Sequence, residues 1–217
     1  DKYHYPPDAI VVEGPKAGGH LGFKIEQLAD PNYQLEKIVT EVITETKKIE
    51  AMTGKSIPVI AAGGIYTGED IYHMLQLGAS GVQMATRFVT TEECDASLEF
   101  KNAYIKCKPE DIGIIKSPVG MPGRAIINEF LQDVIAGGKK PFVCPYHCIS
   151  TCDYETSPYC ISLALINSKK GRMKHGFAFA GENAYRAEEI VSVKDLVNSL
   201  IQEYDAAVIA EKAKESL

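Results

Sequence analysis

The stretch AIVVEGPKAGGH (residues 9–20) starts as a short β-branched run and ends in a glycine pair followed by His20. Apolar β-branched runs bounded by turn residues are typical of buried strands. Two further runs of this kind follow, IPVIAAGG at 57–64 and GVQMATRF at 81–88. Runs that are apolar throughout predict parallel strands that are covered on both faces.

The segments between and after these runs have helical periodicity. Residues 33–52 carry apolar side chains at helical spacing with charges on the other face, and residues 67–79 start with cap residues and stop at Gly78. Further helices are expected at 125–138 and 191–217, with an irregular segment at 139–160. Strands alternating with amphipathic helices predict an α/β fold with right-handed crossovers.

Composition narrows the class of protein. The chain has 217 residues, 45% of them hydrophobic and 24% charged, which is ordinary for a globular domain. Its net charge of -6 argues against a nucleic-acid partner, which needs a basic surface. No apolar run is long enough to span a membrane, and the first residues do not resemble a signal peptide. We therefore expect a cytoplasmic protein with no membrane partner.

The predicted strands end in residues suited to binding an anion. They run into Glu13-Gly14, Gly63-Gly64 and the segment from Gln83 to Thr86. Glycines after parallel strands allow backbone N–H groups to approach a phosphate, and a following helix N-terminus adds its dipole. The alternative is that Gly63-Gly64 only forms a tight turn. Neither a G-x-G-x-x-G sequence after the first strand nor a Walker A sequence is present.

Four strings together resemble the nitronate monooxygenase family, which includes FMN-dependent enoyl-ACP reductases. They are DAIVVEGPKAGGHLG (8–22), IPVIAAGGI (57–65), LGASGVQMATRF (77–88) and, more weakly, GMPGRAIINEF (120–130). The resemblance implies a TIM (β/α)8 barrel that binds FMN without a covalent bond. It also implies that the three predicted strands are the last three of eight.

The resemblance implies roles for particular residues. His20 matches the family's catalytic histidine, which acts beside the flavin as a base or orienting group. The positions that match FMN-contacting residues are Gly14, Gly19, Gly64, Gln83, Met84, Ala85 and Thr86. Two positions depart from the family pattern, which usually has glycine at Ala85 and often an acid at Lys16. Both departures leave the FMN hypothesis standing but leave the substrate open.

The resemblance also implies missing strands. Three strands cannot close a barrel, so we expect the N-terminal barrel half on the same polypeptide or on a second chain. On this interpretation residues 1–135 are the C-terminal part of an FMN-binding barrel. Residues 136–217 are a Cys-rich segment and a helical extension.

Four of the six cysteines lie within seventeen residues, with the spacing C-x3-C-x3-C-x7-C. In a cytosolic protein this density favours metal or redox chemistry over disulfides. The thiols are candidate ligands of an iron–sulfur cluster or a zinc ion, although the spacing matches neither common zinc ribbons nor ferredoxins. The alternative is that they pack as small apolar residues. The four are Cys144, Cys148, Cys152 and Cys160.

The leading functional hypothesis is an FMN-dependent oxidoreductase that oxidises alkyl nitronates or a related small molecule, with His20 handling a proton. The first alternative is an FMN-dependent enoyl-ACP reductase, for which NAD(P)H would be a partner. The alternatives of another class are a non-redox barrel that binds a phosphorylated ligand and a structural metal-binding subunit. A homo-oligomer remains open.

Overall fold

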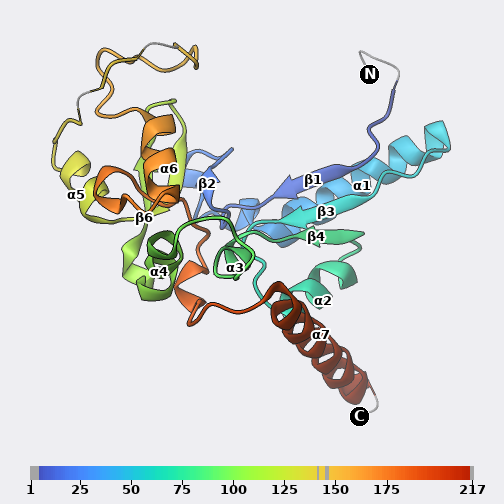
Figure 1. Cartoon of the computed structure of the whole chain (residues 1–217). Helices are drawn as coiled ribbons and strands as arrows, with labels where there is room; N and C mark the ends of the chain where they lie inside the picture. Colours follow the sequence, from blue (N-terminus) through green and yellow to red (C-terminus); the bar gives the residue numbers. More distant parts are fainter. Residues whose placement is uncertain (1–4, 141, 145–146, 216–217) are drawn as a thin grey trace. The chain divides into compact units, whose positions relative to one another are not determined.

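The computed structural model describes residues 5–140, 142–144 and 147–215. The chain forms two compact units (Figure 1), and each is described by itself. The first is built from Asp1–Lys16, Glu26–Ala85 and Val193–Leu217, the second from Ala17–Ile25 and Thr86–Ser192. These units differ from the division expected after residue 135, which concerns a barrel boundary and stays a prediction. Among the described residues, no helix is both long and apolar enough to cross a membrane.

The first unit contains a parallel three-stranded sheet in the order β1-β3-β4. Its register places Val12 beside Ala61 and Ala61 beside Val82. The strands are β1 (Ile10–Glu13), β3 (Val59–Ala62) and β4 (Gly81–Gln83), and the helices are α1 (Leu35–Thr53), α2 (Gly68–Gln76) and α7 (Val193–Glu215). This unit confirms the α/β fold and the parallel strands expected from the sequence.

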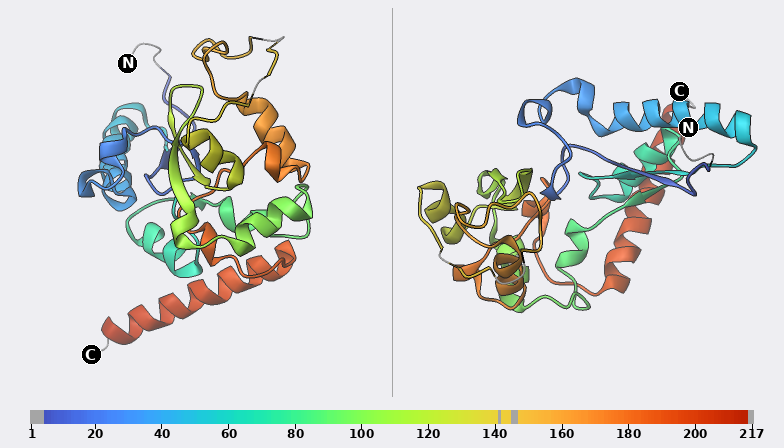
Figure 2. Two further views of the ribbon diagram at one scale, coloured as in Figure 1. Left: turned by 90° about the vertical axis from the view of Figure 1, so that its left-hand side faces the viewer. Right: turned by 90° about the horizontal axis from the view of Figure 1, so that it is seen from above.

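Helix α1 covers one face of this sheet (Figures 1 and 2). Its buried positions, Leu35, Val39, Ile43 and Thr46, recur every three or four residues and form one stripe. The apolar members pack on the strands, and fully burying one such side chain contributes about 1.5–3 kcal/mol. Gly54 ends the helix with a φ of 70°, which glycine adopts at little cost.

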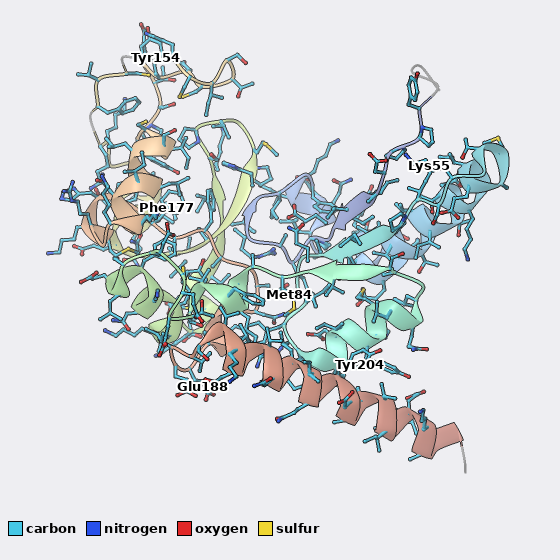
Figure 3. The ribbon with its side chains drawn as sticks, turned by 45° about the vertical axis from the view of Figure 1, so that its right-hand side comes forward. Lys55, Met84, Tyr154, Phe177, Glu188 and Tyr204 are labelled. Carbon is cyan, nitrogen blue, oxygen red and sulfur yellow. The ribbon has the colours of Figure 1, made fainter. Side chains whose placement is uncertain are left out.

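Helix α2 is fixed at its start and along one side. Thr67 and Asp70 form a reciprocal capping box at its N-terminus. A Cβ added at Gly68 would lie 2.2 Å from the carbonyl oxygen of Leu200 on α7, so only glycine permits this approach. The rings of Tyr72 and Tyr204 meet edge to face, with centroids 5.6 Å apart, and Figure 3 labels Tyr204 on α7. The pair holds α7 on α2.

The face of this sheet opposite α1 is partly exposed in the described residues, although Ala62 at its carboxyl end is buried. Val11, which points away from the α1 side, is 54% exposed. Strands β1 and β4 each pair with β3 alone. Exposed apolar side chains on a short sheet with two open edges indicate a surface that further chain can cover.

The second unit contains an antiparallel sheet in the order β2-β6-β5. Aromatic rings of Phe130, Tyr159 and Phe177 pack in its core, and Figure 3 labels Phe177 there. The strands are β2 (Gly19–His20), β5 (Ile112–Lys116) and β6 (Pro122–Ile126). The helices are α3 (Thr86–Val89), α4 (Leu98–Lys106), α5 (Glu129–Ile135) and α6 (Ile161–Lys169).

Two boundaries expected from the sequence are wrong. The strand expected over 81–88 stops at Gln83, and α3 begins at Thr86. The helix expected over 125–138 begins only at Glu129, because the preceding residues pair with β5 and the side chain of Asn128 caps the helix. Antiparallel pairing between distant segments overrides the local helical pattern there.

Replacing Gly68 by alanine should destabilise the packing of α2 on α7. The new methyl group would meet backbone atoms of Leu200 and Tyr204 at 2.2 and 2.3 Å, and neither helix can yield cheaply. We expect Gly68→Ala to lower the free energy of unfolding by about 2 kcal/mol or more in urea denaturation. Gly22→Ala is the control, since nothing lies within 4 Å of its added Cβ. Equal stability of the two variants would contradict this packing.

Candidate functional site

The strand ends of the first unit lie at one level. Glu13 and Gln83, the last residues of β1 and β4, pair on either side of Ala62, the last residue of β3. Side chains at paired positions of parallel strands lie on the same face of the sheet. The two polar side chains therefore flank Ala62 at the carboxyl edge, where α/β proteins place their ligands.

A glycine turn follows β3 at this edge. Gly63 and Gly64 have φ values of 86° and 88°, a region that other residues rarely adopt. A Cβ at Gly64 would lie 2.8 Å from Cβ of Lys16, so the lysine stem packs directly on the glycine backbone. The turn after β3 and the turn after β1 are thus in contact.

Two charged side chains border these turns. Lys16 is exposed, and within the described part of the chain no ion pair of Lys16 or of Glu13 is found. Partial burial raises the pKa of the Glu13 carboxyl. Lys16 can thus offer its charge to an anion at the glycine turn.

The sequence suggested that a helix N-terminus would help to bind an anion at this edge, but the first amides of α2 are hydrogen-bonded to carboxylates of the protein. The amides of Tyr66 and Thr67 both donate to the carboxylate of Asp70, at 2.8 and 2.9 Å. The amide of Gly68 donates to the carboxylate of Glu203 at 2.7 Å. These donors are used within the protein, so an anion at this edge would be held by the glycine turn and not by the amides of α2.

Other predicted residues of this unit have packing roles. The amide of Gly14 donates to the carbonyl of Ala62 at 2.8 Å, and its Cα packs on Leu35, where an added Cβ would approach to 2.8 Å. Met84 packs against the apolar core beneath α1. Ala85, by contrast, is exposed. A contact between Gly14 and FMN would therefore not use the Gly14 amide.

His20 lies in the second unit, in strand β2. Its Nε2 atom lies 2.7 Å from Oγ of Ser117, and its ring meets the edge of Phe179 with centroids 4.9 Å apart. Burial lowers the pKa of His20, because the imidazolium loses hydration. The side chain is therefore oriented by a hydroxyl and favoured in its neutral form, as a general base requires.

Ser117 was not predicted as a site residue. It lies in the turn between β5 and β6 and is only 3% exposed. Its amide donates to the carbonyl of Met121, and its carbonyl accepts a hydrogen bond from the amide of Gly120. The sequence SPVG at 117–120 indicates this turn but not its contact with a histidine 97 residues away. Only the pairing of β2 with β6 brings the two side chains together.

The surroundings of the two glycines before His20 explain why glycine stands at residues 18 and 19. An added Cβ at Gly18 would lie 2.5 Å from backbone atoms of Ala180 and Gly181, whereas Gly19 has a φ of 83° and open space around it. The hydroxyl of Thr86 accepts from the amide of Gly181 at 3.2 Å. Gly19, His20 and Thr86 thus belong to the second unit, while the other predicted FMN contacts belong to the first.

The predicted cysteine ligands lie together. Cys144, Cys148, Cys152 and Cys160 are all free thiols, and all four line one pocket of about 240 Å³. Among the described residues, however, no three His, Cys, Asp or Glu side chains are placed to hold a single metal ion. A site for a single ion such as zinc is therefore not formed among the described residues, although the four cysteines line a common pocket.

Comparisons with known proteins identify the family and the fold. The family model described as "Nitronate monooxygenase" matches residues 3–203. The chain belongs to the nitronate monooxygenase family. A curated relative named "Probable nitronate monooxygenase", from Staphylococcus aureus strain Newman, is 39% identical over 127 residues, which are 58% of this chain and 34% of that relative.

Two solved structures have a similar fold. FabK from Thermotoga maritima matches with a TM-score of 0.70 and 25% identity, over 97% of this chain and 58% of that chain. Nitroalkane oxidase from Streptomyces ansochromogenes matches with a TM-score of 0.67 and 25% identity, over 94% and 53%. This member of the nitronate monooxygenase family thus spans about a third of its curated relatives and somewhat over half of these structures.

The contact between His20 and Phe179 leads to a prediction about the pKa of the histidine. Phe179 contributes apolar surface against the imidazole, so its removal should hydrate the ring and stabilise the imidazolium. We expect Phe179→Ala to raise the pKa of His20 toward the ordinary value of a hydrated histidine, measured by NMR titration. Phe100→Ala, which removes a ring packed on Tyr104, should leave that pKa unchanged. An unchanged pKa in Phe179→Ala would show that burial by this ring is not the cause.

Proposed function

We propose that the chain is part of an FMN-dependent oxidoreductase that oxidises alkyl nitronates or a related small molecule. The observation that carries the proposal is the environment of His20, a half-buried imidazole that accepts or donates a hydrogen bond to Ser117 and is favoured as the neutral base. Membership of the nitronate monooxygenase family supports the same reaction class. FMN, when bound, would accept electrons from the substrate.

The sheet of the first unit is proposed to be the last three strands of a TIM barrel. The parallel order β1-β3-β4, the two edges that pair with β3 alone and the exposed Val11 support this, as does the share of its relatives that the chain spans. The missing strands would cover the face that carries Val11. Residues 1–135 would then form the barrel part and 136–217 the extension.

The phosphate of FMN is proposed to bind at the turn of Gly63 and Gly64. This turn fits a phosphate because the backbone has no Cβ there and because Lys16, whose stem packs on Gly64, brings a positive charge. Gln83 at the end of β4 supplies a further polar side chain at the same edge. The departure from the family pattern at Lys16 is then favourable for an anion.

His20 is proposed to exchange a proton with the substrate. Its Nε2 atom is engaged by Ser117, which fixes the ring plane, and its neutral form can accept a proton near neutral pH. Ser117 in turn is held in a tight turn by its own backbone hydrogen bonds. This chain therefore supplies an oriented base, whereas the redox step belongs to the cofactor.

The purified full-length protein tests the reaction class. We expect bound flavin, with an absorbance maximum near about 450 nm, and oxygen consumption with an alkyl nitronate. Oxidation of NAD(P)H that depends on an enoyl thioester would instead support the reductase. A protein without flavin after reconstitution with FMN, and inactive in both assays, would overturn the proposal.

Gly64→Ala should weaken FMN binding. Alanine at a φ of 88° is strained, and its Cβ would displace Lys16 from the turn. We expect the dissociation constant for FMN to rise about tenfold or more, measured by flavin fluorescence. Gly54→Ala is a matched control, because that glycine has a φ of 70° but ends α1 with nothing within 4 Å. Equal binding by both variants would remove the glycine turn from the site.

His20→Asn should separate binding from turnover. Asparagine keeps a polar side chain of similar reach but cannot act as a base near neutral pH, so FMN content should persist while kcat falls about 100-fold or more. His73→Asn, on the exposed side of α2, should leave kcat unchanged. Full activity of the His20 variant would exclude this residue from proton transfer.

A further inference from the structure

The segment 139–160, here called the Cys-rich loop, joins α5 to α6 without a helix or strand in its described residues. Within the described residues, the Thr151 hydroxyl donates to the Val119 carbonyl at 3.0 Å and the Lys140 side chain bonds Asp133 on α5, whereas the Lys140 amide bonds the Pro158 carbonyl at 2.7 Å inside the loop itself. Loops of this length inside compact units are uncommon and are usually functional or disordered. Tyr159 anchors the end of the loop in the aromatic core and Ile149 packs against the same core, which leaves the arrangement of the cysteines to be explained.

The thiols of this loop converge on one place. Cys144, Cys148, Cys152 and Cys160 line the same pocket, together with His147 and Tyr154, whose rings lie 4.3 Å apart. Figure 3 labels Tyr154 on this loop. All four cysteines are free, so no disulfide orders the loop. Four thiols from seventeen residues thus share one space.

These cysteines differ from one that packs in a core. Cys107 is 7% exposed and lies among alanines and Tyr104, and burial raises its pKa to about 11. Cys148 in the loop is exposed, and the other three loop cysteines are half-buried. Packing as small apolar residues therefore explains Cys107 but not the loop thiols.

Helix α6 supports an anionic ligand in the same pocket. Cys160 occupies its N-cap position, where Ser, Thr, Asp and Asn are preferred, yet its side chain makes no capping hydrogen bond. The first residues of the helix, Ile161 and Ser162, also line the pocket. The positive end of the helix dipole would stabilise thiolates and an anionic group bound by them.

The volume of the pocket favours an iron–sulfur cluster over a single metal ion. A zinc ion needs its sulfurs about 2.3 Å away, which leaves no cavity between them, and no three side chains are so placed in the described residues. A pocket of about 240 Å³ whose lining includes all four cysteines suits a larger group with several attachment points. We propose that Cys144, Cys148, Cys152 and Cys160 bind an iron–sulfur cluster through four thiolates.

Binding would order the loop from within. Each thiol loses its proton as it coordinates iron, and the cluster ties Cys160 on α6 to the three cysteines of the preceding loop. The site uses residues of the second unit alone. It is independent of the proposed FMN site, so either proposal can fail without the other.

The test is anaerobic reconstitution of the full-length protein with ferrous iron and sulfide. We expect about four irons and four sulfides per chain and a broad absorbance near about 400 nm that bleaches with dithionite. Cys148→Ala, an exposed position whose change does not disturb a core, should lower iron content at least fourfold. Cys94→Ala, a half-buried cysteine outside the loop, is the matched control and should retain the iron.

Each other outcome would overturn the proposal. Zinc bound without sulfide would replace the cluster by a single-ion site. Neither metal nor sulfide in a folded protein, or loss of equal iron from Cys94→Ala and Cys148→Ala, would exclude a specific cluster. Flavin content, read near about 450 nm in the same samples, reports separately on the FMN proposal.

Discussion

Strand β3 pairs in parallel with β1 on one side and with β4 on the other, and this pairing sets the positions of the strand ends at the carboxyl edge of the first unit. The register sets Glu13, Ala62 and Gln83 at one level, so the turns that follow leave the sheet at the same edge. Burial of the α1 stripe holds this register, because a slip by one residue would turn Val12 and Ala61 away from the helix. The contact of Lys16 with Gly64 is a consequence of that alignment.

In the second unit, the main structural constraint is the position of the His20 imidazole. Strand β2 has only two residues, yet its pairing with β6 fixes Gly19 beside Arg124 and His20 beside Gly123. The buried Arg124 guanidinium donates to the carbonyl of Ala17 at 2.9 Å, which secures the chain just before the glycines. Ser117 and Phe179 then act on His20 from two separate segments, one orienting the ring and the other reducing its hydration.

The Cys-rich loop contrasts with both sheets. Strands and helices of this chain are held by backbone ladders and apolar stripes, whereas the described part of the loop has no helix or strand and is anchored in the core mainly by Tyr159 and Ile149. Its four cysteines line one pocket and are not part of that core. A cluster site would thus perform for the loop the structural task that the apolar core performs elsewhere.

The sequence by itself determined the elements whose signals are local. The β-branched runs, the stripe of α1, the Thr67 cap and the glycine turns are read within a few residues, because the 3.6- and 2-residue periods and the φ preference of glycine act at that range. The cysteine spacing likewise predicted a cluster of thiols.

Only the tertiary structure decided that β2, β5 and β6 are strands, and that Ser117 meets His20, because those pairings join segments far apart in the chain. It also decided that the α2 amides are used internally, since the carboxylate of Glu203 comes from a helix 135 residues away. Local periodicity carries no information about such partners.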